Sequence, residues 1–173
     1  MRLSGKVALV TGGGRRIGAA GSRALCKAGY EVVLTYRSSR REAADVAREV
    51  GGTALPLDLS RPASFRRFAD RVRDSRGRLD LLVHNAAVFP RTPVDTLSAA
   101  EWDAVFSVNL RGPALLTGAL LPLLRETRGA GVLFLGDANA GDLWPGYLPY
   151  CLSKLALERL LRGVERDRFA LVA

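Results

Sequence analysis

The stretch V-A-L-V-T-G-G-G-R-R-I-G, from Val7 to Gly18, places four apolar residues directly before a glycine-rich turn and the start of an amphipathic segment. A short apolar run that ends at glycines is typical of a buried strand. Glycines let a backbone approach a phosphate closely, and a helix N-terminus offers unpaired N–H donors and a positive dipole. The stretch therefore predicts a strand–turn–helix unit that cradles a pyrophosphate. Its spacing differs from G-x-G-x-x-G, and a purely structural turn is the alternative.

Short apolar runs alternate with longer amphipathic segments along nearly the whole chain. The strands expected from the short runs are Val7–Val10, Glu31–Tyr36, Thr53–Leu57, Leu79–His84 and Val132–Leu135. The expected helices are Ile17–Ala28, Arg40–Val50, Ala63–Arg76, Ala99–Leu110 continuing through Ala114–Arg125, and Leu148–Arg162. Ser98, followed three residues later by Glu101, is a capping-box signature, and Gly29 stands where a helix should end.

The alternation of strands and helices predicts parallel βαβ units with right-handed crossovers and helices on both faces of one sheet. The expected fold class is therefore α/β, with a doubly wound parallel sheet of the Rossmann type. In such sheets ligands bind at the carboxyl ends of the strands, near the switch in strand order. The 173 residues fit a single domain, and neither a linker nor an internal repeat divides them.

Composition and charge narrow the classes of partner. The net charge of +9 comes largely from arginine in helical segments, interleaved with aspartate as on a solvated helix face. Since no basic stripe with interleaved aromatic residues is present, we expect no nucleic-acid partner. No apolar run approaches the ~20 residues of a membrane helix or the ~7–15 of a signal-peptide core, so we expect no membrane association. Cys26 and Cys151 form no metal or redox motif, which predicts free thiols in the cytoplasm and no metal site.

The strand ends offer residues that would select a cofactor. After Glu31–Tyr36 the chain presents Arg37 and Ser38 in place of a carboxylate that would bind a ribose 2′-hydroxyl. Together with Arg15 in the glycine turn, a guanidinium and hydroxyls favour a 2′-phosphate, so NADP(H) is expected rather than NAD. Asp58, at the end of the third strand, is either an adenine ligand or a turn residue.

Tyr150 and Lys154 lie four residues apart, which places a phenol and an ammonium on one face of a helix. The ammonium favours the phenolate and is expected to lower the pKa of the phenol from its usual value of about 10. A phenol tuned in this way can give a proton to a carbonyl or imine near neutral pH. The pair therefore predicts a proton donor at a redox site.

With these features in place, the sequence resembles the short-chain dehydrogenase/reductase family up to about residue 162. The glycine turn is similar to T-G-x-x-x-G-x-G, with Arg16 at the middle glycine, and H-N-A-A is similar to N-N-A-G. The resemblance implies that Tyr150 is the proton donor, that Lys154 lowers its pKa, and that Asn109 holds a water in the proton relay. The implied cofactor-binding residues are Gly12, Arg15, Arg16, Ile17, Gly18, Arg37, Ser38, Asp58, Leu59, Asn85, Ala86, Ala87, Tyr150 and Lys154.

Three positions resemble the pteridine reductase subgroup of that family. Asp137 stands where the family usually has a catalytic serine, Arg16 lies inside the glycine turn, and Phe89 matches an aromatic residue that sandwiches a pterin against the nicotinamide. An ionised Asp137 only accepts hydrogen bonds, but a protonated or water-bridged carboxyl could relay a proton. The alternatives are a loop or cap aspartate for Asp137 and a core aromatic for Phe89. His84 and Cys151 are expected to be packing residues.

Family members typically continue after the tyrosine helix with a strand, a P-G turn and a substrate lid. Here R-F-A-L-V-A, residues 168–173, would form all or part of that strand, which predicts a domain over residues 1–173 that is incomplete at its C-terminal sheet edge and lacks the lid. The main expectation is an NADPH-dependent reductase of a small carbonyl, imine or pteridine substrate, and a homo-oligomer if the fold is competent. The alternative is a truncated, non-catalytic NADP-binding fragment or pseudoenzyme.

Overall fold

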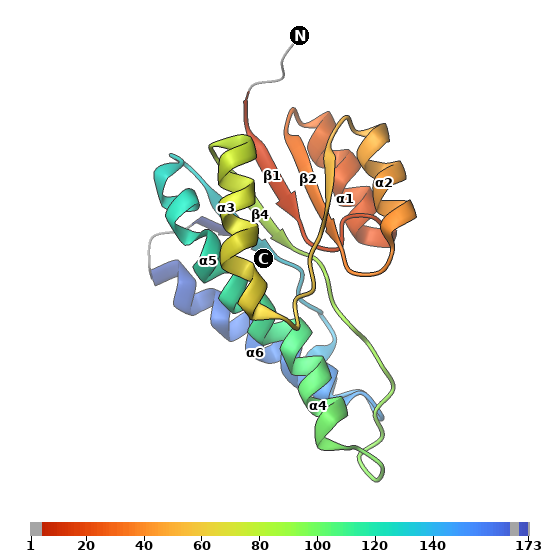
Figure 1. The fold of residues 1–173 in the computed structure, drawn as a ribbon. Coiled ribbons are helices and arrows are strands. Elements are labelled where there is room, and N and C mark those ends of the chain that lie inside the picture. The colour runs from red at the N-terminus through yellow and green to blue at the C-terminus, as the bar shows by residue number, and fades with distance from the viewer. Residues whose placement is uncertain (1–4, 167–169, 173) are drawn as a thin grey trace.

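One parallel sheet organises the protein (Figure 1), and the computed structural model describes residues 5–166 and 170–172. The strands are β1 (Val7–Val10), β2 (Glu31–Tyr36), β3 (Thr53–Pro56), β4 (Leu81–His84), β5 (Gly131–Phe134) and β6 (Ala170–Val172). They lie in the order β3-β2-β1-β4-β5-β6, and every neighbouring pair is parallel. This order switches direction between β1 and β4, as in a doubly wound sheet. The predicted fold class is confirmed.

The last strand was expected within residues 168–173. β6 pairs with β5 over Ala170–Val172. Residues 168, 169 and 173 of the expected strand lie outside the described residues.

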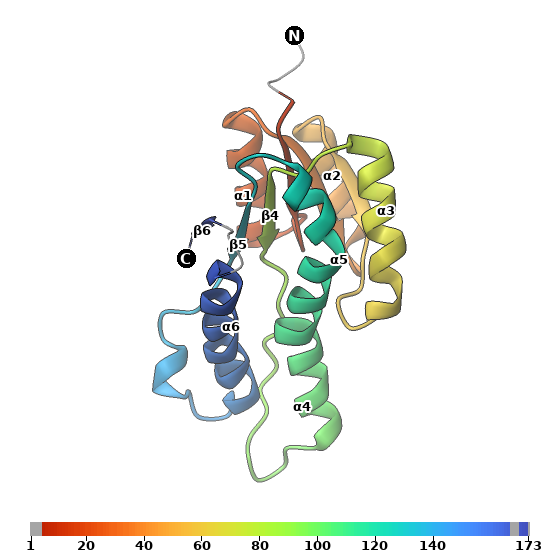
Figure 2. The ribbon, with the colours of Figure 1, turned by 90° about the vertical axis from the view of Figure 1, so that its left-hand side faces the viewer.

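Helices cover both faces of the sheet. They are α1 (Arg16–Lys27), α2 (Arg40–Glu49), α3 (Phe65–Arg76), α4 (Ala99–Phe106), α5 (Gly112–Glu126) and α6 (Leu148–Arg166), with the short helical turns η1 (Pro62–Ser64), η2 (Ser107–Arg111) and η3 (Ala140–Asp142). α1 and α2 pack on one side of the sheet, whereas α3 and α5 pack on the other (Figure 1), and Figure 2 shows α3 and α5 side by side. Most predicted boundaries agree within two residues. The largest difference lies at the C-terminus of α6, which extends to Arg166.

Local signals in the sequence act as predicted at two helix ends. Ser98 accepts a hydrogen bond from the Glu101 N–H, and the Glu101 carboxylate accepts one from the Ser98 N–H, which completes the capping box of α4. Gly29 follows α1 with a φ of +92°, a left-handed conformation that favours glycine.

Apolar residues on alternating strand positions build a core on each side of the sheet. Leu9 and Val33 face the core that includes α3 and α5, whereas Val10 and Leu34 face the core beneath α1 and α2. Successive strand residues point to opposite faces, so a strand that is covered on both faces must be apolar throughout. This explains why the first four residues of the motif, β1, are all buried.

The long helical stretch Ala99–Glu126 contains one wide turn that the sequence did not predict. α4 continues into α5 as expected, but Ser107–Arg111 form a π-helical turn between them. Gly112 packs so closely against β3's exit loop that a Cβ would meet the Leu59 carbonyl oxygen at 2.6 Å. By length and composition the stretch passes as a membrane span. The seven buried residues of α5, including Leu116 and Leu120, assign it instead to the core of this fold.

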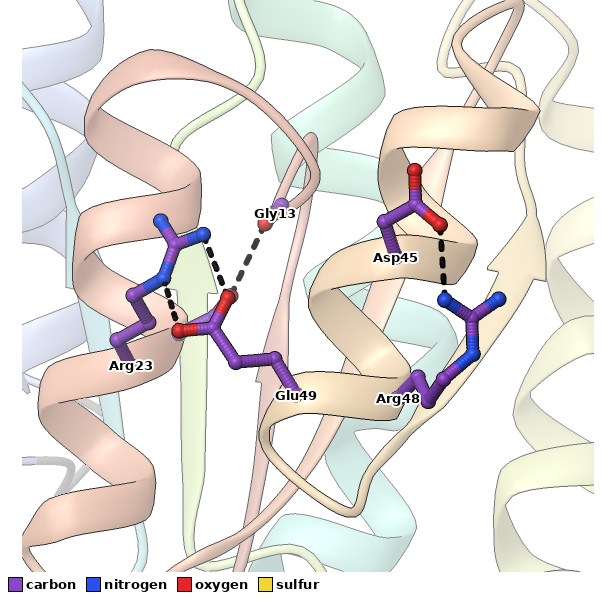
Figure 3. A network of polar contacts seen from close by, with 6 residues as sticks. Gly13, Arg23, Asp45, Arg48 and Glu49 are labelled. Carbon is purple, nitrogen blue, oxygen red and sulfur yellow. Dashed lines mark hydrogen bonds and ion pairs between the residues drawn. The ribbon is translucent and has the colours of Figure 1, made fainter.

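Exposed ion pairs fix neighbouring helices at the surface. Arg23 on α1 donates two hydrogen bonds to the Glu49 carboxylate at the end of α2, at 2.8 and 2.7 Å (Figure 3). Beneath them Ser22 donates to the Gly13 carbonyl oxygen at 3.2 Å, which ties α1 to the glycine turn. The two contacts orient α1 relative to the turn that precedes it.

Asp80 joins the amino ends of three strands and provides a test of the fold. Its side chain accepts hydrogen bonds from the Val7 N–H at 2.8 Å and from Arg78 at 2.6 and 2.9 Å. Replacing Asp80 with alanine leaves the Val7 N–H without that partner, and we expect the free energy of unfolding to fall by about 2–3 kcal/mol in urea denaturation. The control Asp74→Ala removes an exposed carboxylate of α3 and should change stability by less than about 0.5 kcal/mol. Equal losses in both variants would contradict this role.

Candidate active site

The glycine turn adopts the geometry that a close approach to phosphate requires. Gly12 has a φ of +63°, and a Cβ at Gly18 would clash with the Gly12 carbonyl oxygen. Arg16 begins α1 with a φ of +47°, a left-handed conformation that costs a non-glycine residue roughly 1–2 kcal/mol. Arg16, at the middle position of the turn, thus has a backbone conformation that glycine adopts easily, yet it carries a guanidinium at the N-terminus of α1.

A groove of about 350 Å³ opens beside this turn at the carboxyl ends of the strands. All of the predicted cofactor residues line it except Tyr150 and Lys154, which lie beyond the end of β5. The predicted residues in its wall are Gly12, Arg15, Arg16, Ile17, Gly18, Arg37, Ser38, Asp58, Leu59, Asn85, Ala86 and Ala87. The prediction missed the neighbouring residues Thr35, Tyr36, Ser39, Leu57, Val88 and Val108. All but Val108, which lies in the turn η2, are close in sequence to predicted residues at the strand ends, and that closeness was the available signal.

Asp58 is the only carboxylate in the wall of this groove. One of its oxygens accepts hydrogen bonds from the Ser60 N–H at 2.9 Å and the Ser60 hydroxyl at 2.7 Å. Partial burial opposes ionisation, but these hydrogen bonds and the charges of Arg37 and Arg61 hold the pKa of Asp58 below its ordinary value. Asp58 therefore caps the turn after β3. It also lines the groove, the position that an adenine ligand would require.

Asn85 and Thr11 lock the two central strands together at the switch point. The Asn85 side chain donates to the Thr11 and Gly12 carbonyl oxygens at 2.8 and 3.1 Å. The Thr11 hydroxyl oxygen in turn accepts from the Asn85 and Ala86 N–H groups at 3.0 and 3.1 Å. These four bonds fix the floor of the groove, and the sequence had not assigned Thr11 a role.

Tyr150 and Asp137 meet beyond the carboxyl end of β5, although the sequence paired Tyr150 with Lys154. The Tyr150 hydroxyl donates to the Asp137 carboxylate at 2.7 Å, and the other Asp137 oxygen accepts from the Asn139 N–H at 2.9 Å. Burial raises the pKa of Tyr150, and the hydrogen bond to Asp137 and its negative charge raise it further. The expectation of a lowered phenol pKa is therefore wrong for this arrangement, because burial and the Asp137 carboxylate both raise it while the Lys154 ammonium binds elsewhere.

Lys154 lies beside the phenol but its ammonium is held elsewhere. Nζ donates to the Leu135 carbonyl oxygen at 2.7 Å and lies 5.9 Å from the centre of the Tyr150 ring. Burial lowers the pKa of Lys154, while the Asp137 carboxylate partly opposes the shift. The side chain is only 6% exposed, so its charge acts on the site through a medium that screens it poorly.

Asn109 is buried in the wide turn between α4 and α5 and holds two segments of the site together. Its side-chain oxygen accepts from the Val88 N–H at 2.8 Å, and its amide donates to the Val88 carbonyl oxygen at 2.9 Å. The amide also donates to the Ser153 hydroxyl at 3.2 Å, one residue before Lys154. The side chain thus positions the loop after β4 against α6.

Phe89 lies at the mouth of the site within an aromatic cluster that the prediction largely missed. Its ring stacks on Tyr147 at 4.3 Å and meets the edge of Tyr150 at 4.4 Å between ring centres. Trp144 approaches it at 5.9 Å. Phe89 is 47% exposed, so it is not the core aromatic of the alternative interpretation. The sequence signal was the aromatic spacing W-P-G-Y-L-P-Y, residues 144–150, which leads into the first turn of α6.

His84 is a packing residue, as predicted. Its ring stacks on Phe134 at 4.6 Å, and Nε2 forms a hydrogen bond of 2.8 Å with the Thr117 hydroxyl. Complete burial lowers its pKa to about 3. Cys151 is also buried, and over the described residues no group of histidines, cysteines and carboxylates has the arrangement of a metal site.

Comparisons with known proteins agree with this geometry. A family model described as short chain dehydrogenase matches residues 6–168. Versicolorin reductase of Emericella nidulans is 34% identical, and the match covers 96% of this chain and 64% of that protein. A short chain dehydrogenase of Burkholderia cenocepacia, solved in complex with NADP, superposes with a TM-score of 0.88 at 35% identity over 96% of this chain and 70% of that one.

A metagenomic short-chain oxidoreductase in complex with NADP superposes with a TM-score of 0.89 at 35% identity, covering 100% of this chain and 83% of that one. Three of the matching curated relatives are longer, and the chain spans between 64% and 68% of their length.

Proposed function

Because the chain belongs to the short-chain dehydrogenase family, we propose that it is an NADPH-dependent reductase that adds hydride to a C=O or C=N bond of a small molecule. The observation that carries this proposal is the 2.7 Å hydrogen bond between the Tyr150 hydroxyl and Asp137, at the strand ends that also form the groove. We also propose that residues 1–173 act as a single nucleotide-binding domain.

Four side chains of the site would have different roles in proton transfer. A bound NADPH would supply the hydride. Tyr150, whose raised pKa keeps the phenol protonated at neutral pH, would donate the proton to the carbonyl oxygen or imine nitrogen. Asp137 would orient the phenol and, once protonated, return a proton to it. Lys154, which is anchored to the Leu135 carbonyl oxygen, would supply a fixed positive charge, and Asn109 would support the relay by holding α6 in place.

The chemistry of the groove suits NADP in particular. Arg15, Arg16 and the N-terminus of α1 present positive charge to a pyrophosphate. Arg37 and Ser38 follow β2, where a carboxylate would otherwise favour a ribose 2′-hydroxyl. Two structural neighbours were solved as NADP complexes, which supports the same choice.

Substitution of Arg37 tests the preference for NADP. Arg37→Ala removes a charge-assisted hydrogen bond to the 2′-phosphate, worth about 1.5–3 kcal/mol, so the Kd for NADPH should rise by about 10–100-fold. The Kd for NADH should stay within about threefold, because NADH lacks that phosphate. Arg61→Ala is the matched control, since Arg61 pairs with Asp58 but does not line the groove. Equal losses for both cofactors in a fluorescence titration would refute the assignment.

We propose a flat, ring-bearing substrate, with pterins and dihydrofolate as the first candidates. The exposed ring of Phe89 lies against Tyr150 and offers a stacking surface at the reacting phenol. Asp137 in place of a serine and Arg16 in the glycine turn are the further features that support a pteridine-type substrate.

Oxidation of NADPH measured with pterin, dihydrofolate, an aromatic ketone and an aliphatic ketone tests the function. We expect turnover of the ring compounds and little with the aliphatic ketone. NADPH binding without turnover of any of the four would favour the alternative, a non-catalytic nucleotide-binding protein. Absence of NADPH binding would defeat both interpretations.

We also propose a cytoplasmic homo-oligomer. Cys26 and Cys151 carry free thiols, as suits a reducing compartment, and the oligomer is the expectation from the family. Light scattering after gel filtration measures the mass of the particle. A monomer at micromolar concentration would contradict the proposed homo-oligomer.

A further inference from the structure

A second pocket lies beside the cofactor groove, on the side of α4. Its volume is about 480 Å³, within the range of small-molecule sites. We call it the α4 pocket. The residues that define it are Arg37, Ser60, Phe89, Pro90, Ala104 and Val105. None of the residues proposed for proton transfer lines it, and Pro90, Ala104 and Val105 belong neither to the cofactor groove nor to the proposed reaction.

The wall of the α4 pocket is largely apolar, and its polar members are Arg37, Ser60 and Ser107, whose hydroxyl donates to the Ala104 carbonyl oxygen at 2.9 Å. Phe89, Pro90, Ala104 and Val105 form its body, whereas Arg37 and Ser60 stand at the end that adjoins the groove. Apolar walls with a few polar groups at one end are the usual form of a site that orients a small ligand.

The polar end favours a negative charge. Arg37 is exposed and forms no salt bridge in the part of the chain that the structure describes, and the whole chain carries a net charge of +9. The nearby Asp58 carboxylate feels the charge of Arg37, but it is hydrogen-bonded to Ser60, paired with Arg61 and does not line the pocket. An anionic group at this end would therefore meet an available guanidinium.

From this arrangement we infer that the α4 pocket binds a small amphipathic anion, with an aromatic or apolar body between Phe89 and Ala104 and a carboxylate, sulfonate or phosphate at Arg37. The pocket shares Phe89 with the proposed substrate position, and it shares Arg37, Val88 and Val108 with the cofactor groove. Its occupant therefore competes with the 2′-phosphate of NADPH for the Arg37 guanidinium. The shared residue makes the anion and NADPH weaken each other's binding by the same factor.

Titration with 8-anilinonaphthalene-1-sulfonate, an aromatic anion whose fluorescence rises on binding, tests the site. Ala104 is exposed on α4 and lines the α4 pocket but not the groove. Ala104→Trp fills the pocket and Ala104→Glu places a carboxylate in it, and each should raise the Kd of the dye at least tenfold. Ala100→Trp is the matched control, an exposed alanine one turn earlier that does not line the pocket, and should leave the Kd within about twofold.

Competition with NADPH and NADH distinguishes dye binding in the α4 pocket from dye binding in the cofactor groove. NADPH should raise the Kd of the dye, whereas NADH should leave it unchanged, and the uncharged Ala104→Trp variant should not alter the Kd for NADPH. Displacement by both cofactors, or dye binding that Ala104→Trp does not weaken, would overturn the inference. The Ala104 result depends on neither NADPH binding nor turnover, so failure of the proposed reductase function would be seen separately.

Discussion

Replacing Tyr150 with phenylalanine is expected to lower kcat for NADPH-dependent reduction by about 10²–10⁴-fold, the usual contribution of a positioned proton donor. The substitution removes only the hydroxyl that donates to Asp137 and keeps the ring that packs against Phe89. The Kd for NADPH and the KM for substrate should therefore change by less than about threefold. Steady-state rates and cofactor titration measure the two effects separately.

Tyr147→Phe is the matched control for this prediction. Tyr147 lies three residues earlier and stacks on the same Phe89 ring, but its hydroxyl is not the one that binds Asp137. Its loss should change kcat by less than about twofold. Equal rates for wild type and Tyr150→Phe would exclude the phenol as the proton donor, and equal losses in both tyrosine variants would indicate damage to the aromatic cluster.

Replacing Asp137 with asparagine tests its contact with Tyr150 through a second measurement, the pKa of the Tyr150 phenol. Burial comes first among the causes that raise the pKa of Tyr150, and the Asp137 hydrogen bond and charge follow. In Asp137→Asn the charge is lost and burial remains, so the phenol pKa should fall part of the way toward its ordinary value. An ultraviolet difference titration against Tyr150→Phe follows that one phenol.

Acid should destabilise the fold strongly through His84, the only histidine in the sequence. Its pKa is about 3 in the folded protein, compared with an ordinary value of 6.5. Between these values the unfolded chain binds a proton that the folded chain excludes. The stabilising effect is therefore complete above about pH 6.5 and is lost as the pH falls toward 3. At 1.36 kcal/mol per pH unit the full loss is about 4–5 kcal/mol.

Urea unfolding at about pH 7 and about pH 4.5 tests the role of His84. Over this interval the wild type should lose about 2–3 kcal/mol more than His84→Gln, which keeps a polar group near Thr117 but does not titrate. His84→Leu serves as a second variant that preserves packing against Phe134. Carboxylates contribute equally in all three proteins, so the difference isolates the imidazole. Parallel pH dependences would assign the acid sensitivity to other groups.

The sequence predicted those features that depend on local pattern. The apolar run before Thr11 could only be a strand covered on both faces, and the glycines after it could only be a turn of unusual backbone conformation. The residues expected at the cofactor fell at the ends of parallel strands, and parallel strands bring those ends to one edge. For this reason twelve dispersed positions line one groove.

The features that the sequence did not predict are set by tertiary contacts. The spacing of Tyr150 and Lys154 places them on one helix face but does not reveal that Leu135 holds the ammonium while Asp137 holds the phenol. Burial of the phenol, the first cause of its raised pKa, depends on tertiary neighbours such as Phe89, whose ring packs against Tyr150. Likewise, the hydrogen bond between Asn109 and Val88 depends on how the loop after β4 lies against the turn η2, which the sequence pattern does not give.

The wide turn at Ser107–Arg111 divides the long helical stretch into two rods with different rotational phase. A regular helix advances by about 100° per residue, so an additional residue in one turn rotates everything after it by roughly that angle. Val105 and Leu116 would lie only about 20° apart around an uninterrupted helix, so the wide turn lets Val105 line the α4 pocket while Leu116 faces the core. A single apolar stripe drawn along Ala99–Glu126 would assign one of these faces wrongly. The wide turn therefore rotates the apolar face of α5 relative to that of α4 within one continuous helical stretch.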